Sequence, residues 1–265
     1  MKHLLFDIGN SFAKIASYEN KRFNKISCIP SAVLDKDVAV FLDGLTGIYQ
    51  SVILASVADK KITESVVEIL KRKLNCFVVQ VQTEAEAFGV RCGYSAPSLL
   101  GVDRWLAILG AFNHGKLINN NQAMLVIDCG SVVTVDVVVS NGEHLGGWMM
   151  PNRQLMIESL DNKSTGIHKG LQDEIIKGKQ NEHQINSSST SKLIGRSTTE
   201  CIELGGQLAV VGFLEQCFQY LQNKTSLPYK VFITGGGAED VISNLSFSVE
   251  YLPDLVFDGL SLFIE

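Results

Sequence analysis

The sequence lacks an excess of basic residues and any apolar run long enough to span a membrane. Its 265 residues carry a formal net charge of −5, and charged residues make up 19% of them. This composition argues against nucleic acid as a partner. Without a long apolar run or a signal-like N-terminus, we expect a cytoplasmic protein that does not bind membranes.

Paired cysteines and clustered histidines are also missing. The six cysteines have no short paired spacing and mostly lie inside apolar runs, which argues against a zinc site or a disulfide framework. The five histidines are dispersed and form no ligand motif. We therefore assign no histidine a catalytic role.

A duplicated strand-and-turn pattern is what the chain does contain. The apolar run Met124–Ile127 predicts a buried strand, and an aspartate, a glycine and a hydroxyl residue follow it. The same order appears near the N-terminus, as Asp7-Ile8-Gly9-Asn10-Ser11 against Asp128-Cys129-Gly130-Ser131. The chain therefore reads as two related halves.

Turns of this kind can bind phosphates. Gly9 and Gly130 allow the backbone to approach a polyanion with its amide hydrogens. Neutral donors stand beside them: Asn10, Ser11 and Ser131. The alternative is an ordinary hairpin with a turn glycine, but two matching copies favour a binding site.

Charged residues accompany both turns. An aspartate beside phosphate would repel it unless a cation lay between them, so Asp7 and Asp128 indicate a metal or metal-bound water. Lys14, on the second predicted strand, reaches a phosphate in one interpretation and is a solvated surface residue in the other.

Strands and helices alternate in the first half, which predicts an α/β fold with parallel strands. We expect strands at Ser51–Ser56 and Cys76–Val81, with a helix at Ile62–Leu74 between them. The polar stretch Asn113–Gln122 is the best linker candidate. It divides the chain into domains at 1–116 and 117–265.

A buried helix is predicted from Trp105 to Phe112, with Asp103 and Arg104 in its first turn. The backbone dipole favours an acid there and keeps it ionised. Asp103 is then a proton acceptor, or, in the simpler interpretation, a helix cap with Arg104 as its ion-pair partner.

The second half continues with extended and polar segments. A hairpin turn at Ser140–His144 leads to an extended segment at Leu145–Pro151 with close-packed glycines. The polar segment Ser159–Ser191 ends in a serine-rich run, which is typical of an exposed mobile loop.

A long helix and a third glycine turn close the chain. The spacing from Ser197 to Glu200 predicts a capped helix that runs to about Asn223. Close helix packing, within or between subunits, would explain its Gly205-Gly206 pair. After the strand Tyr229–Ile233, Gly235-Gly236 leaves room for a flat ring or a sugar.

Taken together, the motifs resemble a known family. They are Asp7-Ile8-Gly9-Asn10-Ser11, Tyr94, Gly101-Val102-Asp103-Arg104-Trp105, Asp128-Cys129-Gly130-Ser131 with Thr134 and Asp136, Leu145-Gly146-Gly147, Thr234-Gly235-Gly236 and the tail Pro253–Leu260. In this order, along nearly the whole chain, they resemble type III pantothenate kinases of the actin-like ATPase superfamily. The resemblance implies two duplicated actin-like (ribonuclease H-like) α/β domains with mixed sheets flanked by helices and a nucleotide cleft between them.

The resemblance also implies a reaction and its ligands. It implies ATP-dependent phosphorylation of pantothenate to 4′-phosphopantothenate, the first step of coenzyme A biosynthesis, with Mg²⁺ and with K⁺ or NH₄⁺. The ATP-binding residues implied are Asp7, Ile8, Gly9, Asn10, Ser11, Lys14, Gly130, Ser131, Thr134, Gly235 and Gly236.

The remaining implied roles concern the second substrate. Asp103 would be the general base, and Tyr94, Gly101, Val102 and Arg104 would line the pantothenate pocket. Arg104 suits a carboxylate or amide because its fork can donate two parallel hydrogen bonds. Further implied roles are Asp128 at a monovalent cation and Thr198 reaching pantothenate from the neighbouring subunit of a homodimer.

Two positions depart from the family pattern, and two other functions stay open. Ser131 stands where threonine is usual, and Asn152 replaces the glycine that usually follows Pro151; asparagine can adopt positive φ more readily than most residues. A transcriptional accessory protein that keeps the nucleotide cleft is one alternative, and a polyphosphatase-like hydrolase is the other. Intact Asp7, Asp103, Arg104 and Asp128 favour an active enzyme over the accessory protein, and the motif Gly101-Val102-Asp103-Arg104-Trp105 disfavours the hydrolase.

Overall fold

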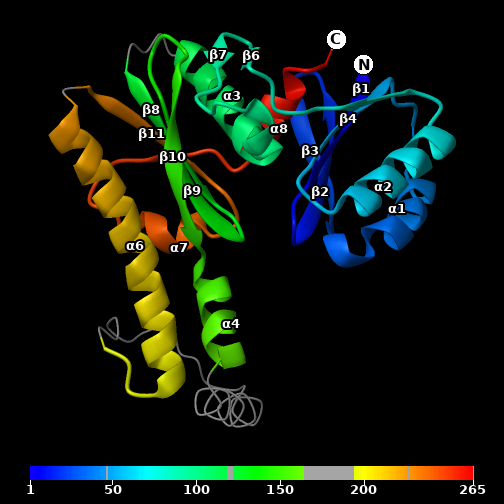
Figure 1. The fold of residues 1–265 in the computed structure, drawn as a ribbon. Helices are drawn as coiled ribbons and strands as arrows, with labels where there is room; N and C mark the ends of the chain where they lie inside the picture. Colours follow the sequence, from blue (N-terminus) through cyan, green and yellow to red (C-terminus); the bar gives the residue numbers. More distant parts are fainter. Residues whose placement is uncertain (46, 118–121, 164–193, 226, 265) are drawn as a thin grey trace.

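The fold consists of two β-sheets with helices around and between them. A computed structural model describes the chain except for residues 46, 118–121, 164–193, 226 and 265. Two five-stranded sheets and a small hairpin, β6 (Glu86–Ala87) with β7 (Val90–Arg91), are present in the described residues. Figure 1 shows one large sheet in each half of the molecule, with α3 (Val102–Leu117) and α8 (Leu255–Ser261) between them. The predicted α/β class is confirmed.

The N-terminal sheet has the order β3-β2-β1-β4-β5. Its strands are β1 (Lys2–Ile8), β2 (Phe12–Glu19), β3 (Arg22–Pro30), β4 (Ser51–Ser56) and β5 (Phe77–Gln80). β1 pairs antiparallel with β2 and parallel with β4, so the sheet is mixed, as predicted. Leu4 and Phe6 pack in one core while Leu5 packs in another, which explains why the strand is apolar without interruption.

The C-terminal sheet repeats this topology. Its strands are β8 (Ala123–Cys129), β9 (Val132–Val138), β10 (His144–Pro151), β11 (Tyr229–Thr234) and β12 (Glu250–Tyr251). Their order, β10-β9-β8-β11-β12, again places the third, second, first, fourth and fifth strands side by side. The predicted duplication is therefore present in the fold.

Helices cover both sheets and separate them. The outer helices are α1 (Leu34–Asp43), α2 (Lys60–Lys73), α4 (Arg153–Lys163), α6 (Thr198–Lys224) and α7 (Ala238–Ile242). α1 and α2 share a core with the N-terminal sheet, and α6 shares one with the C-terminal sheet. The central helix α3 packs on α8, β8, β9 and β4, and its Trp105 is fully buried. The predicted buried helix is thus the element that joins the halves.

Among the predicted boundaries that were wrong, two have a clear physical cause. The linker prediction at Asn113–Gln122 fails over Asn113–Leu117, because α3 continues through these residues. The polar side chains there have tertiary partners, since His114 Nε2 lies 3.0 Å from Asp258 Oδ2 on α8. Helix α2 begins at Lys60 instead of Ile62, because the Asp59 carboxylate accepts the amide hydrogen of Lys61 at 2.8 Å and caps the helix. The domain boundary after residue 116 stays a prediction.

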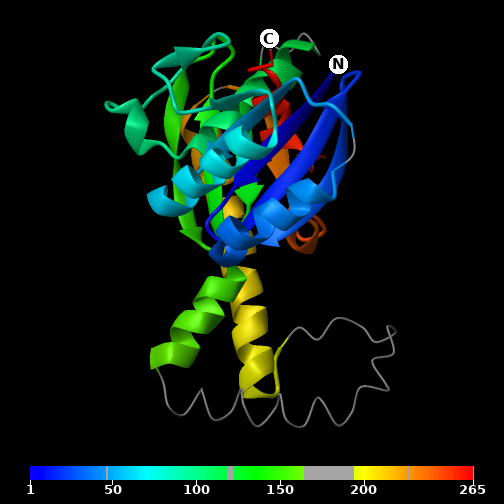
Figure 2. The ribbon, with the colours of Figure 1, turned by 90° about the vertical axis from the view of Figure 1, so that its right-hand side faces the viewer.

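The helices α4 and α6 extend together beyond the sheets (Figure 2). α6 begins as predicted, with the Ser197 hydroxyl accepting the amide hydrogen of Glu200 at 3.2 Å. A Cβ on Gly206 would lie 2.9 Å from the Arg153 side chain, so this glycine allows α4 to pack closely. The loop prediction for Ser159–Ser191 was wrong for its first five residues, which belong to α4, and its remainder lies outside the described residues.

Within the part of the chain that the structure describes, no helix combines the length and the apolarity required to cross a membrane.

Candidate active site

A cavity of about 680 Å³ lies where the two halves of the chain face each other. Most of the predicted site residues line it, although they come from distant parts of the sequence. They are Asp7, Gly9, Asn10, Ser11, Lys14, Tyr94, Gly101, Asp103, Arg104, Asp128, Gly130, Ser131, Thr134 and Gly236. The fold therefore brings both glycine turns and the first turn of α3 to one place.

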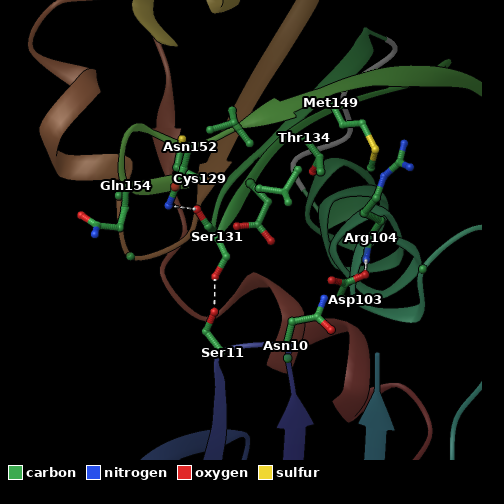
Figure 3. A pocket seen from close by; sticks show the side chains of 18 of the residues that line it. Asn10, Ser11, Asp103, Arg104, Cys129, Ser131, Thr134, Met149, Asn152 and Gln154 are labelled. Carbon is green, nitrogen blue, oxygen red and sulfur yellow. Dashed lines mark hydrogen bonds between the residues drawn. The ribbon is translucent and has the colours of Figure 1, made fainter. Parts of the chain in front are cut away.

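The two glycine turns meet across the cavity. The hydroxyls of Ser11 and Ser131 are 2.8 Å apart and face each other in Figure 3. The first turn is closed by a hydrogen bond from the Gly9 amide to the Phe12 carbonyl at 3.0 Å. Ser31 supports it from behind by donating its hydroxyl to the Gly9 carbonyl at 2.7 Å. The two turns are thus joined by a hydrogen bond between their serine hydroxyls, at the surface of the cavity.

Four predicted residues do not line the cavity. Ile8 and Val102 are buried in the apolar cores because their side chains point away from the turns that they belong to. Gly235 has a φ of +93°, and a side chain there would collide with Asp128 and Cys129. It packs behind the second turn, while Gly236 and Gly237 reach the cavity. Thr198 is exposed at the start of α6.

Four carboxyl groups line the cavity, and three of them lie at the glycine turns and the first turn of α3: those of Asp7, Asp103 and Asp128, with Asp240 as the fourth. Burial raises the pKa of Asp7 to about 7, with Lys14 opposing and Asp103 and Asp128 adding to the rise. Burial likewise raises the pKa of Asp128 to about 6, against the influence of Lys14. Such a cluster of buried acids is electrostatically unfavourable without a cation. A bound cation would relieve it.

The acids are not arranged as a complete metal cage. Among the described residues, no group of three or more histidine, cysteine, aspartate or glutamate side chains is close enough to hold a metal ion together. Mg²⁺ commonly uses one or two carboxylates, with water and substrate phosphates as its other ligands. The residues present fit a metal ion that binds together with a nucleotide.

Removing the Asp7 carboxyl is expected to flatten the pH dependence of stability in the metal-free protein. Because folding raises its pKa to about 7, the folded state binds more protons than the unfolded state between about pH 4 and pH 7. The contribution of the Asp7 carboxyl to the free energy of unfolding therefore falls as the pH rises through that range. In thermal unfolding with EDTA, Asp7→Asn should show a shallower decline than wild type and a higher midpoint near pH 7.5.

The exposed Glu64, which lies on α2, provides the control for this measurement. Glu64→Gln should retain the wild-type slope, because its carboxyl lies outside the cavity. Equal slopes in Asp7→Asn and wild type would contradict the assignment of this titration to Asp7.

Asp103 lies in the first turn of α3 with its carboxylate in the cavity. Its Oδ1 accepts the amide hydrogen of Arg104 at 2.7 Å, which orients the side chain. A Cβ on Gly101 would lie 2.6 Å from the same oxygen, so only glycine leaves room for this orientation. Burial raises the pKa of Asp103, and the hydrogen bond from Arg104 opposes the rise. The carboxylate is therefore a stronger base than an exposed aspartate.

The sequence predicted either Asp103 or pantothenate as the partner of Arg104, but in the structure its partner is Asp136. Its Nε and Nη2 donate to the two oxygens of Asp136 at 3.0 and 2.6 Å, and its Nη1 donates to the Tyr94 hydroxyl at 2.9 Å. Burial alone would lower the pKa of Arg104, but these hydrogen bonds raise it overall. The predicted Arg104–Asp103 ion pair is replaced by Arg104–Asp136, and the two parallel donors expected for pantothenate are used within the chain.

His144 completes this buried network, a role that the sequence analysis missed. Its Nε2 lies 3.0 Å from Asp136 Oδ1, and its Nδ1 accepts the amide hydrogen of Gly93 at 3.3 Å. The ring also stacks on Tyr94, with the centroids 6.2 Å apart. The sequence did carry one signal for this network, although not for His144 itself. Thr134 and Asp136 are polar residues at alternate positions of an apolar strand, so both side chains lie on the same face of the sheet.

The rest of the cavity lining includes residues that, apart from Asn152, no motif marked. They come from the loop after β10 and from α4, α6 and α7: Asn152, Arg153, Gln154, Gln207, Val210, Gly237, Asp240 and Val241. Figure 3 shows Asn152 and Gln154 beside the second glycine turn. Arg153 and Asp240 stand 4.0 Å apart there. These residues converge only through helix packing, so their sequence spacing carried no signal.

Asn152 does not adopt the positive φ that its replacement of glycine suggested. The non-glycine residues with positive φ in the described part of the chain are Asn20, Lys21 and Phe88. Asn152 instead uses its side chain, which donates to the Gly130 carbonyl at 3.0 Å and accepts the amide hydrogen of Leu155 at 2.8 Å.

Comparison with known proteins identifies similar sequences and a similar fold. The family profile of type III pantothenate kinase matches residues 3–220. The type III pantothenate kinase of Ectopseudomonas mendocina is 34% identical over 264 residues, covering 98% of this chain and 97% of that protein. That of Alcanivorax borkumensis is 29% identical over 260 residues, covering 97% and 96%. The polyphosphate/ATP-glucomannokinase of Arthrobacter sp. strain KM shares the fold, with a TM-score of 0.50, 13% identity and coverage of 98% and 97%.

Proposed function

The chain belongs to the type III pantothenate kinase family, and on that basis we propose how its residues carry out the reaction. The activity is the ATP-dependent phosphorylation of pantothenate, which yields 4′-phosphopantothenate for coenzyme A biosynthesis. One observation carries the proposal for the site: the carboxylate of Asp103 shares a single cavity with both glycine turns.

The triphosphate of ATP would lie between the turns at Gly9 and Gly130. Asn10, Ser11 and Ser131 would donate to its oxygens, and the exposed ammonium of Lys14 would add positive charge. The adenosine would extend toward Gly236, where α6 and α7 border the cavity. This assignment is supported by the presence of all these residues in the lining of one cavity.

Mg²⁺ would be held by Asp7 and Asp128 together with the phosphates of ATP. When bound, it supplies positive charge that offsets the charge of the transferring phosphoryl group. Asp128 would also contact the monovalent cation, K⁺ or NH₄⁺. The raised pKa values of Asp7, about 7, and Asp128, about 6, support this role, because they come mainly from burial of the carboxylates, a cost that a bound cation would offset.

Asp103 would act as the general base. The hydroxyl oxygen of pantothenate attacks the terminal phosphorus of ATP, the bond from that phosphorus to the bridging oxygen breaks, and ADP leaves. The hydroxyl proton passes to Asp103 as the new bond forms. Phosphoryl transfer requires mainly alignment and charge stabilisation, so a carboxylate held in place by the Arg104 amide is sufficient.

Pantothenate would bind near Tyr94, Gly101 and Arg104. Three of the five N–H groups of Arg104 are used by Asp136 and Tyr94. The others are available for a carboxylate or an amide of the substrate. Tyr94 is held by Arg104 and by stacking on His144, so the pocket would be rigid before the substrate arrives.

A homodimer would complete the site, with Thr198 of one subunit reaching the pantothenate of the other. Thr198 is exposed at the start of α6, on the part of that helix that extends beyond the sheets (Figure 2). Apolar side chains are exposed on α4, at Leu155 and Leu160, and on α6, at Leu208. A Cβ on Gly205 would contact no other atom, so a helix of a neighbouring subunit could approach closely there.

The enzyme would work in the cytoplasm, where coenzyme A metabolism uses its product.

A coupled assay of ADP release tests this function. We expect release only when ATP, Mg²⁺ and pantothenate are all present, and faster release with K⁺ than with Na⁺ as the sole monovalent ion. Phosphate release without pantothenate would instead identify a hydrolase. No turnover under any condition would favour a regulatory protein that retained the nucleotide cleft, and would overturn the kinase assignment.

A further inference from the structure

Asn152 connects the second glycine turn to the helix that follows β10. Its side-chain Nδ2 donates to the Gly130 carbonyl at 3.0 Å, and its Oδ1 accepts the amide hydrogen of Leu155 at 2.8 Å. Because both partners are backbone groups of fixed polarity, only this orientation of the side-chain amide satisfies them together. Asn152 also donates its own amide hydrogen to the Ser131 carbonyl at 3.4 Å.

These contacts hold the peptide planes of the turn. The Gly130 carbonyl and the Ser131 amide belong to one planar trans peptide, in which the oxygen and the hydrogen point in opposite directions. Holding the carbonyl therefore also sets the direction of the Ser131 N–H. Without the Asn152 side chain, no bond from the described residues would hold the Gly130 carbonyl itself, although the turn would keep the backbone hydrogen bond from Gly237 to the Cys129 carbonyl, the Ser11–Ser131 hydrogen bond and its two flanking strands.

We infer that Asn152 is a positioning residue for nucleotide binding, because its side-chain amide fixes the orientation of the Gly130–Ser131 peptide that binds the ATP phosphates. This inference rests on the proposed function, which assigns the phosphates to that turn. The same side chain caps α4 through Leu155, so the position of the turn is tied to the start of that helix.

The serine substitution separates the two roles of the side chain. A serine hydroxyl can accept the Leu155 amide hydrogen and preserve the cap, but it is too short to also reach the Gly130 carbonyl. In N152S we expect the KM for ATP to rise about three- to tenfold, as for loss of one neutral hydrogen bond. The KM for pantothenate should stay close to wild type, and the melting temperature without nucleotide should fall by only about 2–4 °C, as for one lost hydrogen bond.

A second variant and a cap control complete the test. N152D keeps the size of the side chain and the cap but places a carboxylate oxygen against the Gly130 carbonyl, so its KM for ATP should rise more than that of N152S. D59A removes the cap of α2, where Asp59 accepts the Lys61 amide hydrogen at 2.8 Å outside the cavity. D59A should lower the melting temperature and leave both KM values unchanged.

The outcomes are distinguishable from failure of the proposed function. If wild type phosphorylates pantothenate but N152S and N152D bind ATP as well as wild type does, Asn152 is only a helix cap and the inference is wrong. If either variant unfolds, calorimetric titration of the folded one with a non-hydrolysable ATP analogue gives the same answer. Absence of pantothenate-dependent turnover in wild type would refute the proposed function itself.

Discussion

Replacing Asp103 with asparagine is expected to lower kcat by about 10²- to 10⁴-fold, the usual range for loss of a general acid or base. Asparagine has the same size and its side-chain oxygen can still accept the Arg104 amide hydrogen, which Asp103 accepts at 2.7 Å. It cannot accept a proton from the pantothenate hydroxyl. The fold and the KM for ATP should therefore be preserved while turnover is lost, as measured by ADP release at saturating substrates.

The matched control is Asp59→Asn, the same chemical change at another helix N-terminus, on α2 and outside the cavity. It should leave kcat within about twofold of wild type. The wild-type pH profile adds a second measurement: because Asp103 has a raised pKa and must be deprotonated to act, kcat/KM should fall on the acidic side. Unchanged turnover in purified Asp103→Asn would remove Asp103 from the role of base.

Replacing Asp136 with leucine is expected to destabilise the protein by about 3–5 kcal/mol, the cost of breaking a buried ion pair from one side. Arg104 would keep its positive charge in a site where only 7% of its surface is exposed, and His144 would lose a partner 3.0 Å away. A guanidinium stays protonated near neutral pH even without its partner, so losing the proton would not relieve the charge. Urea unfolding at neutral pH measures the change.

The double variant Arg104→Met with Asp136→Leu tests the cause. With both charges removed and the volume roughly kept, the loss of stability should be smaller than in Asp136→Leu alone. Pantothenate turnover should nevertheless stay low, because Tyr94 would lose the hydrogen bond that orients it. A double variant that is less stable than the single one would show that lost packing, and not an unpaired charge, causes the effect.

Local patterns predicted the elements of the site well. The aspartate and glycine of each turn follow an apolar strand, and the turn has the same form wherever the strand is placed. Gly9 and Gly130 accordingly line the cavity as predicted. Gly235 was assigned to the cavity from its sequence position, but in the structure it packs behind the second turn. Its positive φ and its close contact with Asp128 depend on the tertiary structure.

The partner of Arg104 was beyond the reach of sequence reasoning. Asp103 is adjacent in the chain and seemed the natural partner, yet Asp136 is 32 residues away and lies within hydrogen-bonding distance because β9 passes beside α3. His144 is positioned by the pairing of β10 with β9. The pairing register of these strands and the position of α3 depend on side-chain packing in the two halves. Spacing along the chain does not predict them.

The sequence alone therefore determined the α/β class, the duplication and the two acidic glycine turns, because each depends on the order of apolar, charged and glycine residues over a few positions. Only the tertiary structure decided which groups face one another. It assigned Arg104 to Asp136 and attached Asn152 to the Gly130 carbonyl. Contacts between distant residues require the packed cores, since a side chain meets its partner only after the strands and helices have taken their places.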